Sequence, residues 1–423
     1  MRFLLRSRST VPAAVLGLLV SFAAAPVRAE PVRRQLNATK AAVFHDSIGV
    51  CTKFSFDGSI YDQYTNDIAW YLKNLGVKWV RDGVFNQTDV NKLKTVNSKS
   101  GVKFLLISAM YGGDGRLDPG QAARNADLMN QLRGKLVGIE GPNEYDQFKP
   151  GNEPDWAGRL RQYQDRLFTE VNKRRGIRNV RILAPSLVSS RGSYAALGNI
   201  TNDCDAANFH YYPGVPEWEI VAKRDEARIS KPNGQIWCTE FGWRTPPVDY
   251  YVSEQIQARY ALRGYAELFR RGVRRSSLYA LYDHPTNGGF ESGQRWGLLK
   301  RDGTQKPSYQ AIRRMINLIR DSRYNFTAGK LDYTIDTFGK DVRQLALRHS
   351  DGRRFLFLYR PIDVWDYQAK KSKPFSYVSV RVKVHTPHSQ VREHIPNNGT
   401  VKTVSTDTTY GIGDRVVILE IKP

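Results

Sequence analysis

Two glutamates follow apolar stretches of similar design, and a pair of carboxyl groups can carry out acid–base or nucleophilic chemistry. In VGIEGPNEYD, residues 137–146, a short apolar run leads to Asn143 and Glu144. In QIWCTEFGW, residues 235–243, another apolar run leads to Glu240. An amide beside a carboxyl can hold a substrate hydroxyl while the carboxyl moves a proton. Each glutamate alone could instead be a solvated surface residue, so the elements that carry them must decide.

From about residue 41 to about residue 322, short apolar runs alternate with longer amphipathic ones, which favours a parallel sheet with crossover helices. Eight such units in about 280 residues predict a closed (β/α)8 TIM barrel, whose chemistry lies at the carboxyl ends of the strands. A doubly wound sheet is the alternative, although the first run lacks the glycine-rich phosphate turn of that fold. The expected strands span residues 47–51, 79–81, 103–108, 137–141, 181–184, 207–210, 235–239 and 276–282. The expected helices span residues 65–75, 89–96, 119–132, 156–172, a short stretch near Tyr194, 217–229, 253–271 and 308–319.

The pattern changes after residue 325. Runs such as RFLFLYR and YVSVRVKVH have the length and alternation of strands, and Asp351-Gly352 and Asn398-Gly399 supply turns between them. We therefore expect a barrel domain over residues 30–325 and a small antiparallel β-sandwich domain over residues 326–423, packed on the barrel.

The first 29 residues have the pattern of a secretory signal peptide. Arg2, Arg6 and Arg8 precede an apolar stretch, and Val27-Arg28-Ala29 offers a cleavage site before Glu30. The apolar stretch is too short to span a bilayer comfortably, and no other stretch is long and apolar enough. We expect export to the periplasm or the medium, and a monomer.

The chain carries a formal net charge of +23, which favours contact with polyanions. The basic residues are scattered rather than interleaved with aromatic residues in one tract, so a specific nucleic-acid partner is not expected. An anionic glycan is one candidate target, and solubility alone is the other explanation. Cys51, Cys204 and Cys238 are an odd number without metal-ligand spacing, and we expect buried free thiols.

The strand count places the two glutamates together. Glu144 would end the fourth strand and Glu240 the seventh, on different sides of one barrel, so their carboxyl groups could meet across its mouth. Glycoside hydrolysis uses such a pair.

At these residues the chain resembles clan A of the glycoside hydrolases, over about residues 49–319. NFHYYP, with His210 and Tyr212, is similar to the clan's His-x-Tyr on the sixth strand, and Arg81 is similar to its second-strand arginine. A barrel followed by a small β domain is similar to family thirty-nine and its neighbours. The eighth strand gives Tyr282-Asp283-His284 where many clan members carry a tryptophan, which puts the floor of the sugar site in doubt.

The resemblance implies a retaining hydrolysis of β-glycosidic bonds in a polysaccharide or oligosaccharide. Glu240 would attack the anomeric carbon, and Glu144 would first protonate the leaving oxygen and then take a proton from water. Arg81 and Tyr212 would stabilise the ionised nucleophile, and Asn143 would hold the neighbouring hydroxyl. A non-catalytic carbohydrate-binding protein on the same barrel and a transglycosylase are the alternatives.

Several residues have a competing structural explanation. His210 could be a core histidine, and Trp243 and Trp296 could be core residues or could stack on a sugar ring. Glu140 lies four residues before Glu144, about 13 Å deeper by strand rise, and we expect a buried, paired carboxylate. Asp283-His284 lacks a third ligand nearby, so we expect neither a metal nor a cofactor. We also expect two cleft-shaping loops, at residues 111–119 and 284–295; the first includes the glycine-rich run 112–115, which suggests a phosphate site only superficially.

Overall fold

A computed structural model describes residues 31–109, 115–149, 151, 153–188, 191–212, 219–247, 250–284, 294–337 and 340–423. The expected signal peptide, residues 1–29, lies outside these ranges. Residues 111–114 and 285–293, which belong to the two expected cleft-shaping loops, also lie outside them.

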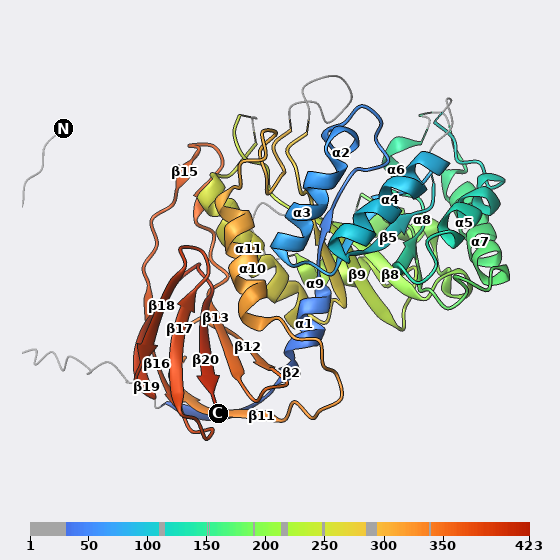
Figure 1. Cartoon of the computed structure of the whole chain (residues 1–423). Coiled ribbons are helices and arrows are strands. Elements are labelled where there is room, and N and C mark those ends of the chain that lie inside the picture. The colour runs from blue at the N-terminus through green and yellow to red at the C-terminus, as the bar shows by residue number, and fades with distance from the viewer. Residues whose placement is uncertain are drawn as a thin grey trace, which may run out of the picture.

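Eight parallel strands close into a barrel in chain order, with β10 pairing with both β3 and β9 (Figure 1). The predicted TIM barrel is confirmed. The fifth strand, β7, is the shortest, because it contributes only two residues to the sheet. The eighth strand ends at Leu278, four residues earlier than predicted. The strands are β3 (Ile48–Cys51), β4 (Trp79–Gly83), β5 (Lys103–Ile107), β6 (Leu136–Glu140), β7 (Ile182–Leu183), β8 (Ala206–Tyr211), β9 (Gln235–Phe241) and β10 (Arg275–Leu278).

The helices around the barrel begin and end where local chemistry favours it. Asn86 and Asp89 form a reciprocal capping box at the start of α4, and the Ser253 side chain accepts from the third backbone N–H of α10. The helix α3 ends at Gly76, whose φ of 86° suits glycine. The helices are α1 (Ala41–Ser47), α2 (Ile60–Gln63), α3 (Thr65–Leu75), α4 (Gln87–Ser100), α5 (Gln121–Asn130), α6 (Tyr145–Phe148), α7 (Trp156–Lys173), α8 (Arg191–Leu197), η1 (Thr201–Asp203), α9 (Ile220–Ala227), α10 (Glu254–Arg270) and α11 (Pro307–Ile319).

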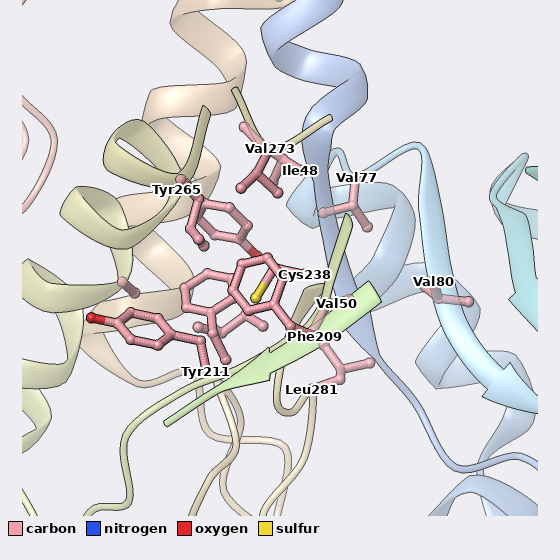
Figure 2. Packing of buried hydrophobic residues seen from close by; sticks show 14 of the residues in the cluster. Ile48, Val50, Val77, Val80, Phe209, Tyr211, Cys238, Tyr265, Val273 and Leu281 are labelled. Atoms are coloured by element: carbon pink, nitrogen blue, oxygen red, sulfur yellow. The ribbon is translucent and has the colours of Figure 1, made fainter. Parts of the chain in front are cut away.

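The largest core lies between the strands and these helices. Figure 2 shows Val50, Phe209 and Cys238 gathered near Tyr265 of α10. The Tyr265 hydroxyl donates to the backbone oxygen of Gly49 at 2.6 Å, which satisfies its polar atom within the apolar layer. Cys238 is free and buried, like Cys51 and Cys204, as the sequence predicted.

The barrel interior is filled by a second, smaller cluster at the amino ends of the strands. Trp79, Leu105, Leu183 and Trp237 are buried there, and the two tryptophan rings lie with their centroids 6.1 Å apart. These side chains fill the end of the barrel interior at which the strands begin.

The C-terminal domain consists of two facing layers with their own core (Figure 1), antiparallel apart from the parallel pairing of β2 with β12, which confirms the predicted sandwich. One residue range is corrected: β1 and β2 precede the barrel in sequence, but they pair with β11 and β12 of this domain. Residues 32–40 therefore belong to its sheets rather than to a barrel domain starting at residue 30, because their pairing covers exposed strand edges. The strands are β1 (Val32–Asn37), β2 (Thr39–Lys40), β11 (Lys330–Ile335), β12 (Arg343–Arg348), β13 (Arg354–Tyr359), β14 (Trp365–Asp366), β15 (Lys371–Ser372), β16 (Val378–Val384), β17 (Gln390–Ile395), β18 (Thr400–Val404), β19 (Asp407–Ile412) and β20 (Val417–Lys422).

Candidate active site

A break in the alternation of β9 turns Glu240 into the barrel. Phe209 on β8 lies opposite Cys238, whereas the next residue, His210, lies opposite Glu240, so Thr239 is the extra residue of a bulge. Cys238 packs in the outer core, and strict alternation would send Glu240 outward as well. Because of the bulge, Thr239 and Glu240 both reach the barrel interior.

Glu144 reaches the site through a strained backbone conformation. The strand β6 ends at Glu140, and Glu144 follows with φ 50° and ψ 38°, in the left-handed region that non-glycine residues rarely adopt. Its backbone N–H donates to the backbone oxygen of Ser186 at 2.9 Å, and Asn143 forms a parallel bridge to the same residue. Strain of this kind is concentrated at functional sites, since neighbouring structure must enforce it.

The structure brings the two glutamates and His210 together. One carboxylate oxygen of Glu144, one of Glu240 and one ring nitrogen of His210 all lie within 4.8 Å of one another. Glu240 and His210 are buried, whereas Glu144 is partly exposed, at the solvent side of the cluster.

Arg81, the middle residue of β4, holds three of the polar groups. Its Nε and NH2 donate to the two oxygens of Glu140 at 2.6 and 2.8 Å, and its NH1 donates to Glu240 Oε1 at 2.5 Å. Its NH2 also donates to Asn143 Oδ1 at 2.7 Å. Arg81 is only 3% exposed, and although burial opposes it, the charges of Glu140 and Glu240 raise the pKa of the guanidinium well above its usual range.

Glu140 is the buried, paired carboxylate that the sequence predicted, but its predicted depth is wrong. Burial raises its pKa, yet the charge and hydrogen bonds of Arg81 outweigh burial and lower it to about 2. His210 Nε2 lies 3.9 Å from Glu140 Oε1 while its Nδ1 lies 2.6 Å from Glu144 Oε1. One imidazole therefore spans the gap between the two carboxylates, because the chain leaves β6 at a Gly-Pro turn instead of continuing upward as a strand.

The partners of His210 determine which nitrogen can exchange a proton. Nε2 lies 3.2 Å from Thr239 Oγ1, and that hydroxyl can donate to Glu140 Oε1 at 3.1 Å or to Asn208 Oδ1 at 2.9 Å. Because the threonine hydroxyl has these acceptors, it accepts from Nε2, and Nε2 keeps its proton. The proton between Nδ1 and Glu144 is then the movable one. Burial opposes the imidazolium, but the charges of Glu240 and Glu144 raise the pKa of His210 to about 10.

Three aromatic rings line the side of the site next to Glu240. The Tyr212 hydroxyl donates to Glu240 Oε2, and the Tyr212 ring lies 5.0 Å from the Trp296 ring and 6.1 Å from the Tyr279 ring, between centroids. Burial of the hydroxyl and the charge of Glu240 raise the pKa of Tyr212 well above its usual range. Tyr279 is not among the predicted site residues, because the apolar run of the eighth strand continues to residue 282 and placed the predicted strand end at Tyr282 to His284.

Trp243 does not join these rings, which corrects its assignment to sugar binding. It is 3% exposed, and its ring contacts Phe241 and Tyr260 at centroid distances of 6.0 and 5.5 Å in the outer core. The same alternation that points Phe241 outward points Trp243 outward. Trp296 is partly exposed and remains available to a ligand.

Asp283 has a structural partner rather than a metal-like environment. Its Oδ1 accepts from Lys306 Nζ at 2.7 Å and from the backbone N–H of Gly297 at 2.8 Å. Both Asp283 and Lys306 are buried, so this ion pair fixes the segment that carries Trp296.

Glu144, His210 and Glu240 have the spacing of metal ligands, but protein donors already engage their atoms. Glu144 Oε1 is bound to His210 Nδ1, and the two oxygens of Glu240 accept from Arg81 and Tyr212. Arg81 supplies, at this position, the positive charge that a cation would bring. The arrangement suits acid–base and nucleophilic chemistry by the carboxylates themselves.

Comparison with solved structures supports the barrel and the appended β domain. A family 39 glycoside hydrolase from Bacteroides cellulosilyticus WH2 matches with a TM-score of 0.63 and 14% identity, over 92% of this chain and 83% of that one. A glucosidase from Croceicoccus marinus matches with a TM-score of 0.61 and 10% identity, over 92% of this chain and 97% of that one. At these identities the likeness establishes the fold, and this fold is the one that the sequence resemblance implied. No protein-family model and no curated protein sequence matches the chain.

No helix within the described ranges is both long and apolar enough to cross a lipid bilayer.

Proposed function

We propose that the protein is a retaining glycosidase of clan A that cleaves a β-linked sugar, with Glu240 as nucleophile and Glu144 as acid/base. The observation that carries the proposal is that a carboxylate oxygen of Glu144 lies within 4.8 Å of a carboxylate oxygen of Glu240, with a ring nitrogen of His210 within the same distance of both. Retaining enzymes hold their carboxyl groups about 5–5.5 Å apart, whereas inverting enzymes leave about 6.5–9.5 Å for a water molecule.

The donors around each glutamate support the division of roles. Glu240 accepts a hydrogen bond at each of its oxygens, from Arg81 and from Tyr212, and these donors hold the carboxylate in a fixed orientation. Glu144 instead shares a movable proton with His210 Nδ1. Nδ1 lies 2.6 Å from Glu144 Oε1, so Glu144 has a neighbour with which it can exchange a proton during the reaction.

The reaction then proceeds in two balanced steps. Glu240 attacks the anomeric carbon, the bond to the leaving oxygen breaks, and Glu144 gives that oxygen its proton. Water next attacks the anomeric carbon of the glycosyl ester, Glu144 takes the water proton, and Glu240 leaves as a carboxylate. Asn143 Oδ1 accepts from Arg81, which leaves Nδ2 to donate to the hydroxyl beside the anomeric carbon.

The test is turnover of an aryl β-glycoside and polysaccharide panel by the parent, Glu240→Gln, Glu144→Gln and, as matched control, Glu254→Gln. Glu254 lies outside the site and pairs with Lys300. We expect Glu240→Gln to lose at least about 10³-fold in kcat and the control to match the parent. Glu144→Gln should keep activity on activated leaving groups and recover with azide, with retained product stereochemistry by NMR.

A Glu240→Gln variant that cleaves as well as the parent, or an inverted product anomer, would contradict the assignment. Mass spectrometry of the products separates hydrolysis from transfer to a second sugar. If the parent binds glycans but turns none over, the protein is a binding module on the same barrel.

Export is part of the same proposal. Residues 1–29 have the arginine-rich start, apolar run and small-residue end of a signal peptide. N-terminal sequencing of the protein recovered outside the cytoplasm should begin at Glu30, and recovery of the uncleaved chain in the cytoplasm would contradict export.

A further inference from the structure

The β14–β15 hairpin belongs to the C-terminal domain by sequence but is anchored on the barrel. The backbone N–H of Val364 donates to the Tyr260 hydroxyl at 3.1 Å, and Arg263 NH1 donates to the backbone oxygen of Ile362 at 2.9 Å. Both partners lie on α10. Figure 1 shows β15 at the upper edge of the C-terminal domain, away from its two sheets.

The hairpin meets the loop after β9 through a pair of stacked tyrosines. The rings of Tyr250 and Tyr367 lie 4.1 Å apart between centroids and only 5° from parallel. Tyr250 is nevertheless 50% exposed. A ring that is covered on one face and still half exposed presents its other face to solvent, so this pair forms a flat platform.

Two lysines lie in the same hairpin as Tyr367. Lys370 Nζ lies 5.5 Å from the centroid of the Tyr251 ring, and both Lys370 and Lys371 are exposed. Cations beside an exposed aromatic face suit a ligand that combines a flat apolar face with negative charge.

Tyr250 lies on the segment that follows β9, the strand that carries Glu240. The backbone N–H of Val252 donates to the oxygen of Arg244 at 2.9 Å, which ties the tyrosine segment to the start of the loop. The Arg244 guanidinium lies 5.4 Å from the centroid of Trp296, the ring that contacts Tyr212. Arg244 lies four positions after Glu240 in the chain, so their Cα atoms are at most about 14 Å apart.

Arg244 is itself available to an anion. No carboxylate lies within ion-pair distance of its guanidinium among the residues that the structure describes, and the side chain is partly exposed. A cation therefore lies beside Trp296, the ring that contacts Tyr212.

We propose that Tyr250, stacked on Tyr367, with Lys370 and Arg244 forms a distal subsite for an acidic polysaccharide whose cleaved bond lies at Glu240. The proposal rests on the glycosidase function proposed above and adds the substrate class, a charged polymer that spans several sugar units. Tyr250 stacks on the apolar face of a pyranose ring, and the two cations bind carboxylate or sulfate groups along the chain.

The test is affinity electrophoresis of the Glu240→Gln protein in gels containing carboxymethylcellulose, alginate or hyaluronan, with hydroxyethylcellulose as the neutral counterpart of the first. We expect retardation by at least one acidic polymer and little by hydroxyethylcellulose. Adding Tyr250→Ala should weaken the apparent Kd about fivefold or more, whereas Tyr250→Phe should keep it. Lys370→Met and Arg244→Met should weaken it less, and should also reduce its dependence on salt.

Trp70→Ala is the matched control, because Trp70 is 55% exposed on α3 and contacts only its neighbour Tyr71 among aromatic rings of the described residues. The proposal is overturned if no acidic polymer retards the Glu240→Gln protein, if Tyr250→Ala and Trp70→Ala bind equally, or if Tyr250→Phe is as weak as Tyr250→Ala. Because binding is measured in an inactive background, absence of turnover by the parent would refute the glycosidase function without refuting the subsite.

Discussion

The barrel interior has two layers of side chains supplied by the same strands: an apolar lower layer, where the strands begin, and a charged upper layer, where the strands end. At the lower end Trp79 and Trp237 are buried among aliphatic side chains. At the upper end, Arg81 lies two positions after Trp79 on β4, and Glu240 lies three after Trp237 on β9. On each of these strands, a charged inward-facing residue therefore follows the tryptophan, and apolar packing gives way to a network of ion pairs.

The lower layer strengthens the ion pairs of the upper layer and also raises the free-energy cost of removing one partner from a pair. It excludes water from beneath Arg81 and Glu140, so their attraction acts in a low dielectric. The same exclusion makes an unpaired charge expensive there. Groups in the upper layer should consequently depend on one another, whereas those in the lower layer should act nearly independently.

The largest expected effect is that of Arg81→Met. Removing the cation leaves Glu140 and Glu240 buried without their partner, and we expect a loss of about 3–5 kcal/mol in the free energy of unfolding. We expect kcat to fall at least about 10²-fold as well, because Glu240 loses a donor. Urea unfolding and single-turnover kinetics measure the two effects.

A double variant tests whether the upper layer is interdependent. Arg81→Met combined with Glu140→Gln removes both members of the pair, and it should be more stable than the sum of the single changes predicts. Simple additivity would mean that the network is a set of separate contacts.

The next largest effect is that of Leu105→Ala in the lower layer. Leu105 is fully buried, and the cavity should lower the free energy of unfolding by about 2–5 kcal/mol. Because the layer supports the site without touching the substrate, kcat should stay within about twofold of the parent at a temperature where both are folded. A loss of kcat in Leu105→Ala as large as that in Arg81→Met would contradict the prediction that the lower layer affects stability but not catalysis.

The smallest expected effect is a change in the pH dependence of stability. Glu140 has a pKa of about 2 in the folded protein, below its ordinary value of 4.5, so its contribution is present above about pH 4.5 and is lost as pH falls toward 2. His210 has a pKa raised to about 10 from 6.5, so its contribution is present below about pH 6.5 and is lost as pH rises through 10. Unfolding midpoints across pH should show the parent most stable between these limits.

Comparing variants across pH shows whether Glu140 causes the loss of stability at low pH, here called the acid limb of the stability curve. Glu140→Gln should flatten it, by at most about 1.4 kcal/mol per pH unit for one proton, whereas Leu105→Ala should shift the whole curve without changing its shape. An acid limb that is equally steep in Glu140→Gln and in the parent would show that other groups cause it.

Much of the fold could be predicted because its signals are local. Apolar runs of strand length at regular intervals predicted all eight barrel strands, and the periodicity of residues 65–75 matched α3 at both ends. The end of the eighth strand could not be predicted from its apolar run, since residues 279–282 are buried without being part of the strand. For this reason the sequence predicted Tyr282 at the end of the strand, and it did not predict Tyr279 at the site.

The sequence by itself predicted which carboxylates, arginine, histidine and tyrosine lie on the barrel strands or just after them, because residue type and strand spacing are properties of the chain. Only the tertiary structure decided where they point. The bulge at Thr239 turns Glu240 inward and Trp243 lies outward, and the left-handed conformation of Glu144 brings it to His210. Neither feature has a sequence signature, because each is enforced by neighbouring strands that are distant in the chain.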